Sequence, residues 1–211
     1  IFSNFIAPCD LCMDFHTSTR GRTNVLHVRA DMSHPEVARL ARAFASNVVI
    51  DSEGPTGSLR QEATAAGVPS ITIEMGEAHR FQRDLIDRAL AGVESVFAEY
   101  ELREAWAVTR PLWRTVIEAE QKTWIRADVG GLVEMHHDRG SLVVEGEPIC
   151  TIANPFKEES DVVTAPFTGL LVGVLENPVV YPGNPLCHIV EIDDRTQRAY
   201  RQAREMGEAA E

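Results

Sequence analysis

The chain has 211 residues, of which 44% are hydrophobic, so it can form one large or two small domains with a buried core. Its 32 acidic residues outnumber its 20 Lys and Arg, and a net charge of −12 without any basic run argues against a nucleic-acid partner. The longest apolar stretches are strand-sized, far below the roughly 18 residues of a membrane span, so we expect no membrane partner.

The start of the chain and its cysteines indicate its setting. Ile1 stands where an initiator Met would, and no signal-peptide pattern follows, so we interpret the chain as beginning within a longer sequence. Four scattered cysteines are too few for a disulfide scaffold and predict a reducing compartment, the cytoplasm. Cys9 and Cys12 form a C-x-x-C that a redox or metal pair would use, but Cys12 lies in a predicted buried strand, and we favour a structural role.

Short apolar runs alternate with amphipathic ones up to about residue 100, which is typical of α/β proteins. Apolar and β-branched runs predict strands buried on both faces over residues 11–15, 47–50 and 70–73, with residues 25–28 as a weaker fourth. The sequence therefore predicts the α/β class, with a parallel or mixed sheet and flanking helices.

Three helices are predicted between these strands. Ser33 offers an N-cap for the first, with Pro35 in the first turn and Glu36 three residues after the cap. The second begins near residue 58 and ends at Gly67, and the third covers residues 81–100.

The C-terminal part repeats itself, because residues 127–133 match 165–171 and residues 144–152 match 180–189. Each half alternates apolar residues with turn glycines over too short a span to bury its own face. We therefore expect the halves to interleave as a small all-β unit that resembles the barrel-sandwich fold of biotinyl and lipoyl domains.

The patterns divide the chain into four parts. Residues 1–105 are predicted to be part of an α/β catalytic domain, residues 106–122 a connector, residues 123–193 the β-repeat domain and residues 194–211 a polar tail, helical or frayed.

Two strand ends carry residues suited to chemistry. His16 follows the first predicted strand, at the position where open α/β sheets place ligands, with Asp14 available to orient its ring. Glu74 ends the strand over residues 70–73, where burial would favour a general base. From the residues alone, a structural His16 and a solvated Glu74 remain open alternatives.

Several motifs together resemble the succinylglutamate desuccinylase and aspartoacylase family. They are the D-F-H-T strand end at residues 14–17, the R-T-N stretch at residues 22–24, the G-S-L-R loop at residues 57–60 and the T-I-E-M-G-E strand end at residues 72–77. The resemblance covers about residues 9–190, and it implies a zinc-carboxypeptidase-like α/β domain followed by a β-rich C-terminal domain.

The resemblance also implies roles for single residues. His16 corresponds to a zinc ligand, and Glu74 corresponds to the catalytic Glu that activates the zinc-bound water. Arg60 corresponds to a substrate-binding arginine that precedes this Glu. The spacing between the two differs from that in aspartoacylase, and the alternative for Arg60 is a solvated helix face. The family's H-G-x-E motif, which holds the other two zinc ligands, is absent from residues 1–211. The implied Zn²⁺ site is therefore incomplete in this chain.

The function implied by the resemblance is zinc-dependent hydrolysis of a small N-acyl amino-acid-like substrate, an amide or alternatively an ester. Zinc would polarise the carbonyl and acidify its bound water, and Glu74 would take the proton and pass it to the leaving amine. The substrate is a small acylated molecule, and a homo-oligomer is left open.

Three alternatives remain. His27, Asp31 and His34 are close enough in sequence to suggest a metal site, but Pro35 and the helix start favour a cap and turn. Lys157 lies between the two β halves, where a biotinyl or lipoyl carrier bears its modified lysine. The residues around it form neither the Met-Lys-Met pattern of biotinyl domains nor the Asp-Lys-Ala pattern of lipoyl domains. The chain could also be an inactive truncated family member.

Overall fold

The computed structural model describes residues 2–102, 117–119 and 121–205, so most of the predicted connector lies outside the described residues. The N-terminal part alternates strands and helices after a short π-helix, η1. Its elements are η1 (Phe2–Ile6), β1 (Cys12–Thr17), β2 (Arg22–Ala30), α1 (Pro35–Ala43), β3 (Val48–Asp51), α2 (Leu59–Ala65), β4 (Ser70–Gly76) and α3 (Arg83–Glu99).

The C-terminal part consists of strands followed by one helix. Its elements are β5 (Ile117–Ala119), β6 (Lys122–Arg126), β7 (Gly131–Met135), β8 (Leu142–Val143), β9 (Pro148–Ala153), β10 (Ser160–Thr164), β11 (Gly169–Leu175), β12 (Val179–Val180), β13 (Pro185–Glu191) and α4 (Asp194–Glu205). The polar tail is thus helical over residues 194–205.

The helix starts follow from local hydrogen bonding. Helix α2 begins after Ser58, whose hydroxyl accepts a hydrogen bond from the Gln61 amide, as an N-cap should. Helix α1 begins at Pro35, where the missing N–H costs nothing. Ser33 is not its N-cap as predicted, because the Ser33 hydroxyl donates to Asp31 in the preceding turn.

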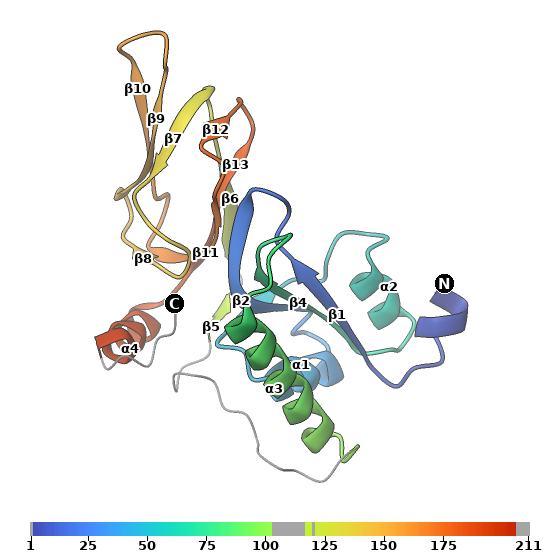
Figure 1. Ribbon diagram of the computed structural model, residues 1–211. Helices are drawn as coiled ribbons and strands as arrows, with labels where there is room; N and C mark the ends of the chain where they lie inside the picture. The colour runs from blue at the N-terminus through green and yellow to red at the C-terminus, as the bar shows by residue number, and fades with distance from the viewer. Residues whose placement is uncertain (1, 103–116, 120, 206–211) are drawn as a thin grey trace.

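A nine-stranded mixed sheet forms the centre of the molecule, in the order β1-β4-β2-β11-β13-β6, with β3, β5 and β8 joined at its sides. Strand β2 connects the N-terminal and C-terminal strands of this sheet. One edge of β2 pairs with β4, and the other pairs with β11 through residues 22–24 and with β3 through residues 28–30. Figure 1 shows β2 standing between the helices and the C-terminal strands.

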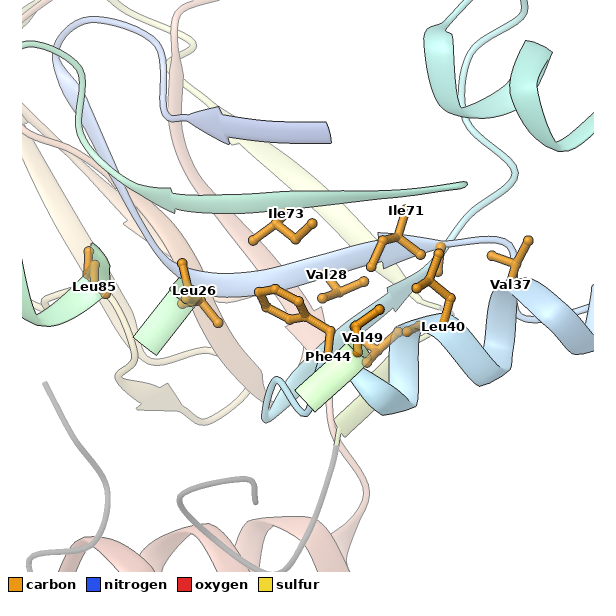
Figure 2. Close-up of a cluster of buried hydrophobic side chains, with 13 residues drawn as sticks. Leu26, Val28, Val37, Leu40, Phe44, Val49, Ile71, Ile73 and Leu85 are labelled. Atoms are coloured by element: carbon orange, nitrogen blue, oxygen red, sulfur yellow. The ribbon is translucent and has the colours of Figure 1, made fainter. Parts of the chain in front are cut away.

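One face of the sheet is apolar and is covered by α1 and α3. Leu26 and Val28 of β2 and Ile73 of β4 pack on Leu40 and Phe44 from the region of α1 (Figure 2). Because side chains alternate along a strand, burying this face leaves the intervening residues of β2 and β4 on the opposite face. That opposite face carries the polar residues described below.

The two β halves interleave. Strand β8 of the first half pairs with β11 of the second, and β12 of the second half pairs with β7 of the first. Strands β10, β9, β7 and β12 form a separate four-stranded sheet, which projects away from the helices (Figure 1).

The structure confirms the α/β class but changes details of the prediction. Strand β2 covers nine residues instead of the four predicted. Strand β1, predicted to be buried on both faces, lies at the end of the sheet order, and its Phe15 is 42% exposed.

The predicted domain division stays a prediction. Strands β6, β11 and β13 belong to the same sheet as β2, so hydrogen bonding continues across the predicted boundary at residue 123. None of the described helices is both long and apolar enough to cross a membrane.

Candidate active site

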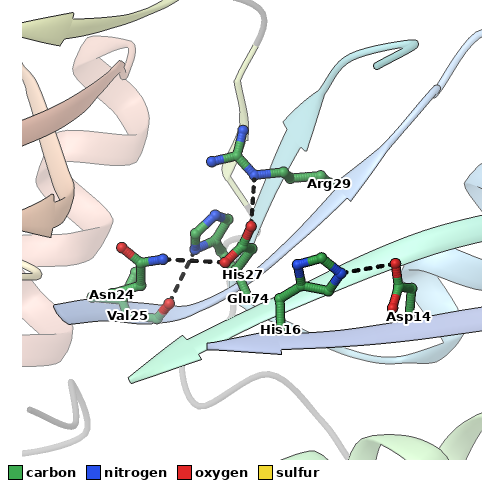
Figure 3. A network of polar contacts seen from close by, with 7 residues as sticks. All are labelled: Asp14, His16, Asn24, Val25, His27, Arg29 and Glu74. Atoms are coloured by element: carbon green, nitrogen blue, oxygen red, sulfur yellow. Dashed lines mark hydrogen bonds and ion pairs between the residues drawn. The ribbon is translucent and has the colours of Figure 1, made fainter. Parts of the chain in front are cut away.

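Strand register brings polar side chains together on the face of the sheet opposite α1 and α3. His16 on β1 lies opposite Glu74 on β4, and Glu74 lies opposite His27 on β2. Directly opposed residues on neighbouring strands project to the same face. Their neighbours Asp14 and Arg29 share that face, two residues along their strands (Figure 3). We call this set of five residues the polar face.

The Glu74 carboxylate is held by two groups from β2. The Asn24 amide donates a hydrogen bond of 3.3 Å to Oε2, and the Arg29 Nε lies 3.6 Å from Oε1, an ion pair beyond hydrogen-bonding distance. The Glu74 side chain is 16% exposed, so it is largely screened from bulk water but still accessible. Burial lowers the pKa of Arg29, and the Glu74 charge acts against that shift.

An irregularity in β2 makes this arrangement possible. In a regular strand, Asn24 and His27 would point to opposite faces because they are three positions apart. The register between β2 and β4 shifts between these two residues. Such bulges re-aim side chains beside functional sites. The shift therefore places Asn24, His27 and Arg29 on one face of the sheet while Leu26 and Val28 stay in the core.

His16 lies at the edge of the polar face with its side chain 49% exposed. Its Nε2 is 2.8 Å from Oδ2 of Asp14, so the carboxylate orients the ring, and Nδ1 has no hydrogen-bond partner within the part of the chain that the structure describes. The contact predicted from the sequence is present, while the role of His16 as a metal ligand stays a prediction.

Arg60 reaches the same region from α2. It is only 6% exposed, and among the described residues it has no hydrogen-bond or ion-pair partner. Burial and the Arg29 charge lower the pKa of Arg60 to about 10, while the carboxylates of Asp31, Glu74 and Asp14 act in the opposite direction. The alternative of a solvated helix face is wrong because the side chain is buried. Its buried Nε has no hydrogen-bond partner among the described residues, and a buried cation of this kind suits an anionic ligand.

The C-terminal strands extend the polar face. His188 on β13 is buried and stacks on Trp124 of β6, with ring centroids 4.7 Å apart. Burial, reinforced by the charge of Arg29, lowers the pKa of both His27 and His188 to about 3. Both imidazoles are therefore neutral near pH 7.

A zinc ion is not accommodated by the described residues alone. A catalytic zinc site needs three protein ligands and an open position. Among residues 2–102, 117–119 and 121–205, no group of three His, Cys, Asp or Glu side chains could hold a metal ion. His16 offers one imidazole, so the described residues do not fit a complete site.

The other metal candidate does not assemble. His27 lies on the polar face, whereas Asp31 and His34 lie in the turn before α1. There the Asp31 carboxylate accepts hydrogen bonds from the amide and hydroxyl of Ser33. His34 Nε2 is 3.5 Å from Asp31, which fits the cap-and-turn interpretation.

The remaining candidates from the sequence are Lys157 and the cysteines Cys9 and Cys12. Lys157 is exposed in the turn between β9 and β10, where its Nζ lies 3.8 Å from Glu159. Cys9 and Cys12 are both free thiols, and burial raises the pKa of Cys12, which makes it a poor nucleophile.

Sequence reasoning missed Asn24, Arg29 and His188 as parts of the site. The R-T-N motif contains Asn24, but the motif alone indicates no role for it. After that motif, His27 and Arg29 alternate with apolar residues, and this local pattern could have predicted a strand with one polar face. His188 could not have been found this way, because it joins the face through pairing between distant strands.

Comparison with known proteins identifies relatives of this arrangement. The family model of the succinylglutamate desuccinylase/aspartoacylase catalytic domain matches residues 1–100. A comparison with curated protein sequences gives no significant match.

Solved structures share the fold. The apo ectoine utilization protein EutE (DoeB) from Ruegeria pomeroyi aligns with a TM-score of 0.80 at 16% identity, over 90% of this chain and 63% of that one. A succinylglutamate desuccinylase from a Silicibacter species has a TM-score of 0.77 at 19% identity, over 90% and 61%. A succinylglutamate desuccinylase/aspartoacylase from Rhodobacter sphaeroides has a TM-score of 0.77 at 16% identity, over 92% and 62%.

The TM-scores show a common fold, and the low sequence identities carry no conclusion beyond the fold. This chain spans less than two thirds of the length of each of the three structures.

Proposed function

The first 100 residues of this chain belong to the succinylglutamate desuccinylase/aspartoacylase catalytic-domain family, and from that premise we propose that the chain is part of a hydrolase. Its substrate is a small N-acyl amino-acid-like molecule, from which it removes the acyl group. The observation that carries this proposal is the carboxylate of Glu74, anchored on the polar face by Asn24 and Arg29.

Glu74 is the general base of the proposed reaction. Its carboxylate takes a proton from a water molecule, and the water oxygen attacks the acyl carbon. The proton then passes to the leaving nitrogen as the carbon–nitrogen bond breaks, so Glu74 returns to its ionised state. Asn24 and Arg29 each hold one carboxylate oxygen, which limits the rotation of the base.

Arg60 is the proposed binding group for a substrate carboxylate. Its buried Nε has no partner among the described residues, and the guanidinium lies close enough to Asp31, Glu74 and Asp14 to sense their charges. A carboxylate would satisfy it by a bidentate, charge-assisted contact. The acid part of an N-acyl amino acid has this chemistry.

Zinc dependence remains part of the proposal, with His16 as one ligand. The described residues do not supply the other ligands, so none of the steps above passes through the ion. Two ligands from outside the described residues would be required to complete a site.

Further elements of the proposal concern the rest of the molecule. The β strands over residues 123–193 form a β-rich domain that supports the polar face through β11 and β13. A cytoplasmic location is supported by four cysteines that are all free thiols.

Hydrolysis of N-acyl amino acids tests the proposal, measured on this chain and on the longest product of its gene. In a form that turns over substrate, Glu74→Gln should lower the rate by roughly a hundredfold to ten-thousandfold and leave the zinc content unchanged. His16→Ala should lose zinc and activity together. Near-normal turnover of Glu74→Gln would refute the role of this residue.

Intact mass distinguishes the alternatives. A carrier protein would show a covalent adduct on Lys157, whereas a hydrolase would show none. An inactive family member would show neither an adduct nor turnover in any form of the gene product.

A further inference from the structure

His27 is a buried imidazole that the mechanism above does not use. It is fully buried and lies directly opposite Glu74 in the regular part of the β2–β4 ladder. Opposed residues on antiparallel strands have Cβ atoms about 5 Å apart, within reach of a side-chain hydrogen bond. Figure 3 shows the imidazole beside Glu74 and Arg29.

The hydrogen bonds of the ring define its tautomer. Nδ1 lies 3.0 Å from the carbonyl oxygen of Val25, which can only accept, so Nδ1 bears the hydrogen. Nε2 then carries a lone pair, and it is buried without a partner among the described residues. Leaving such an acceptor unpaired is costly, which implies that a donor meets it in another state of the protein.

The candidate donor is the carboxyl that lies directly opposite His27. Ionised Glu74 only accepts hydrogen bonds, so it cannot pair with Nε2 in the resting state. The Arg29 Nε is directed toward Glu74, and Asn24 already donates to the same carboxylate. Once Glu74 has taken a proton, its new O–H becomes a donor directly opposite Nε2.

We propose that His27 is a positioning residue for Glu74, whose protonated carboxyl donates a hydrogen bond to Nε2 of His27. This inference rests on the proposed role of Glu74 as a general base. The proton leaves the attacking water for a Glu74 oxygen and later leaves that oxygen for the amine nitrogen. His27 never takes the proton and holds the neutral carboxyl in place between the two transfers.

Glu74→Gln tests the contact without requiring turnover, because the amide places a neutral N–H donor where the protonated carboxyl has its O–H. With histidine labelled with ¹⁵N in the full chain, the wild type should show His27 as the Nδ1–H tautomer. In Glu74→Gln the Nε2 signal should move upfield, as an accepted hydrogen bond requires. Glu77→Gln, which removes a carboxylate paired with Arg80, is the matched control and should leave the signal in place.

Two results would overturn the inference: an Nε2–H tautomer in the wild type, or an unchanged Nε2 signal in Glu74→Gln. Where the protein turns over substrate, His27→Leu should lower kcat roughly tenfold with little change in KM, the equivalent of one net hydrogen bond. His27→Gln, whose amide oxygen accepts, should recover part of the loss. If Glu74→Gln shows the upfield shift but normal turnover, the contact is real and the proposed hydrolase mechanism fails.

Discussion

Acid should destabilise this protein through its two buried neutral imidazoles, His27 and His188. The pKa of each is lowered from 6.5 to about 3 in the folded chain. Between these values the unfolded chain binds protons that the folded chain does not, so stability is lost as the pH falls below 6.5. The loss stops growing once the pH passes below about 3, where the folded state also takes up protons.

The magnitude follows from about 1.4 kcal/mol per proton and pH unit. Going from pH 7 to pH 5 should cost about 2 kcal/mol for each imidazole, or about 4 kcal/mol for both. That is a large share of the roughly 5–15 kcal/mol that stabilises a typical domain.

Urea unfolding at pH 7 and pH 5 measures this difference directly. The single variants His27→Gln and His188→Gln should each remove about half of the difference between the two pH values, and the double variant most of it. His79→Gln, at an exposed position, is the control. If the double variant lost as much stability on acidification as the wild type, burial of neutral imidazoles would not explain the acid sensitivity.

Three further predictions concern a buried charge, the metal and a tight contact. Arg60→Met removes a buried guanidinium with a pKa near 10, so it should raise the free energy of unfolding by about 1–3 kcal/mol in thermal unfolding and weaken substrate binding. The control Arg80→Met, at an exposed position, should change little, and a loss of stability in Arg60→Met would contradict the account. Calorimetry should find weak zinc binding without fixed stoichiometry, since His16 alone cannot replace three ligands, and tight one-to-one binding would disprove this. Gly92→Ala should lower the free energy of unfolding, measured in urea, by about 1–3 kcal/mol, because the new Cβ would lie 2.7 Å from the Phe44 ring. If the variant instead showed the small gain in stability that Ala normally gives within a helix, the Phe44 ring would be able to move aside.

The sequence by itself determined the local elements and the two strand ends of the site. The α/β alternation and the start of a helix near residue 58 follow from short-range patterns, and the structure confirms them. Strands of the two β halves also pair with each other, as the internal repeat predicts. His16 and Glu74 end strands that each pattern identified separately, and parallel pairing of β1 with β4 then brings them side by side.

The tertiary structure alone decided what surrounds Glu74. The register shift in β2 puts Asn24 on the same face as His27 and Arg29, and no local period predicts an inserted residue, because the shift exists only relative to the partner strand. Arg60 is spaced like an exposed helix residue, and only packing of α2 near the polar face buries it. His188 reaches the same face because β11 joins β13 to β2, a pairing across about 150 residues that depends on the whole sheet.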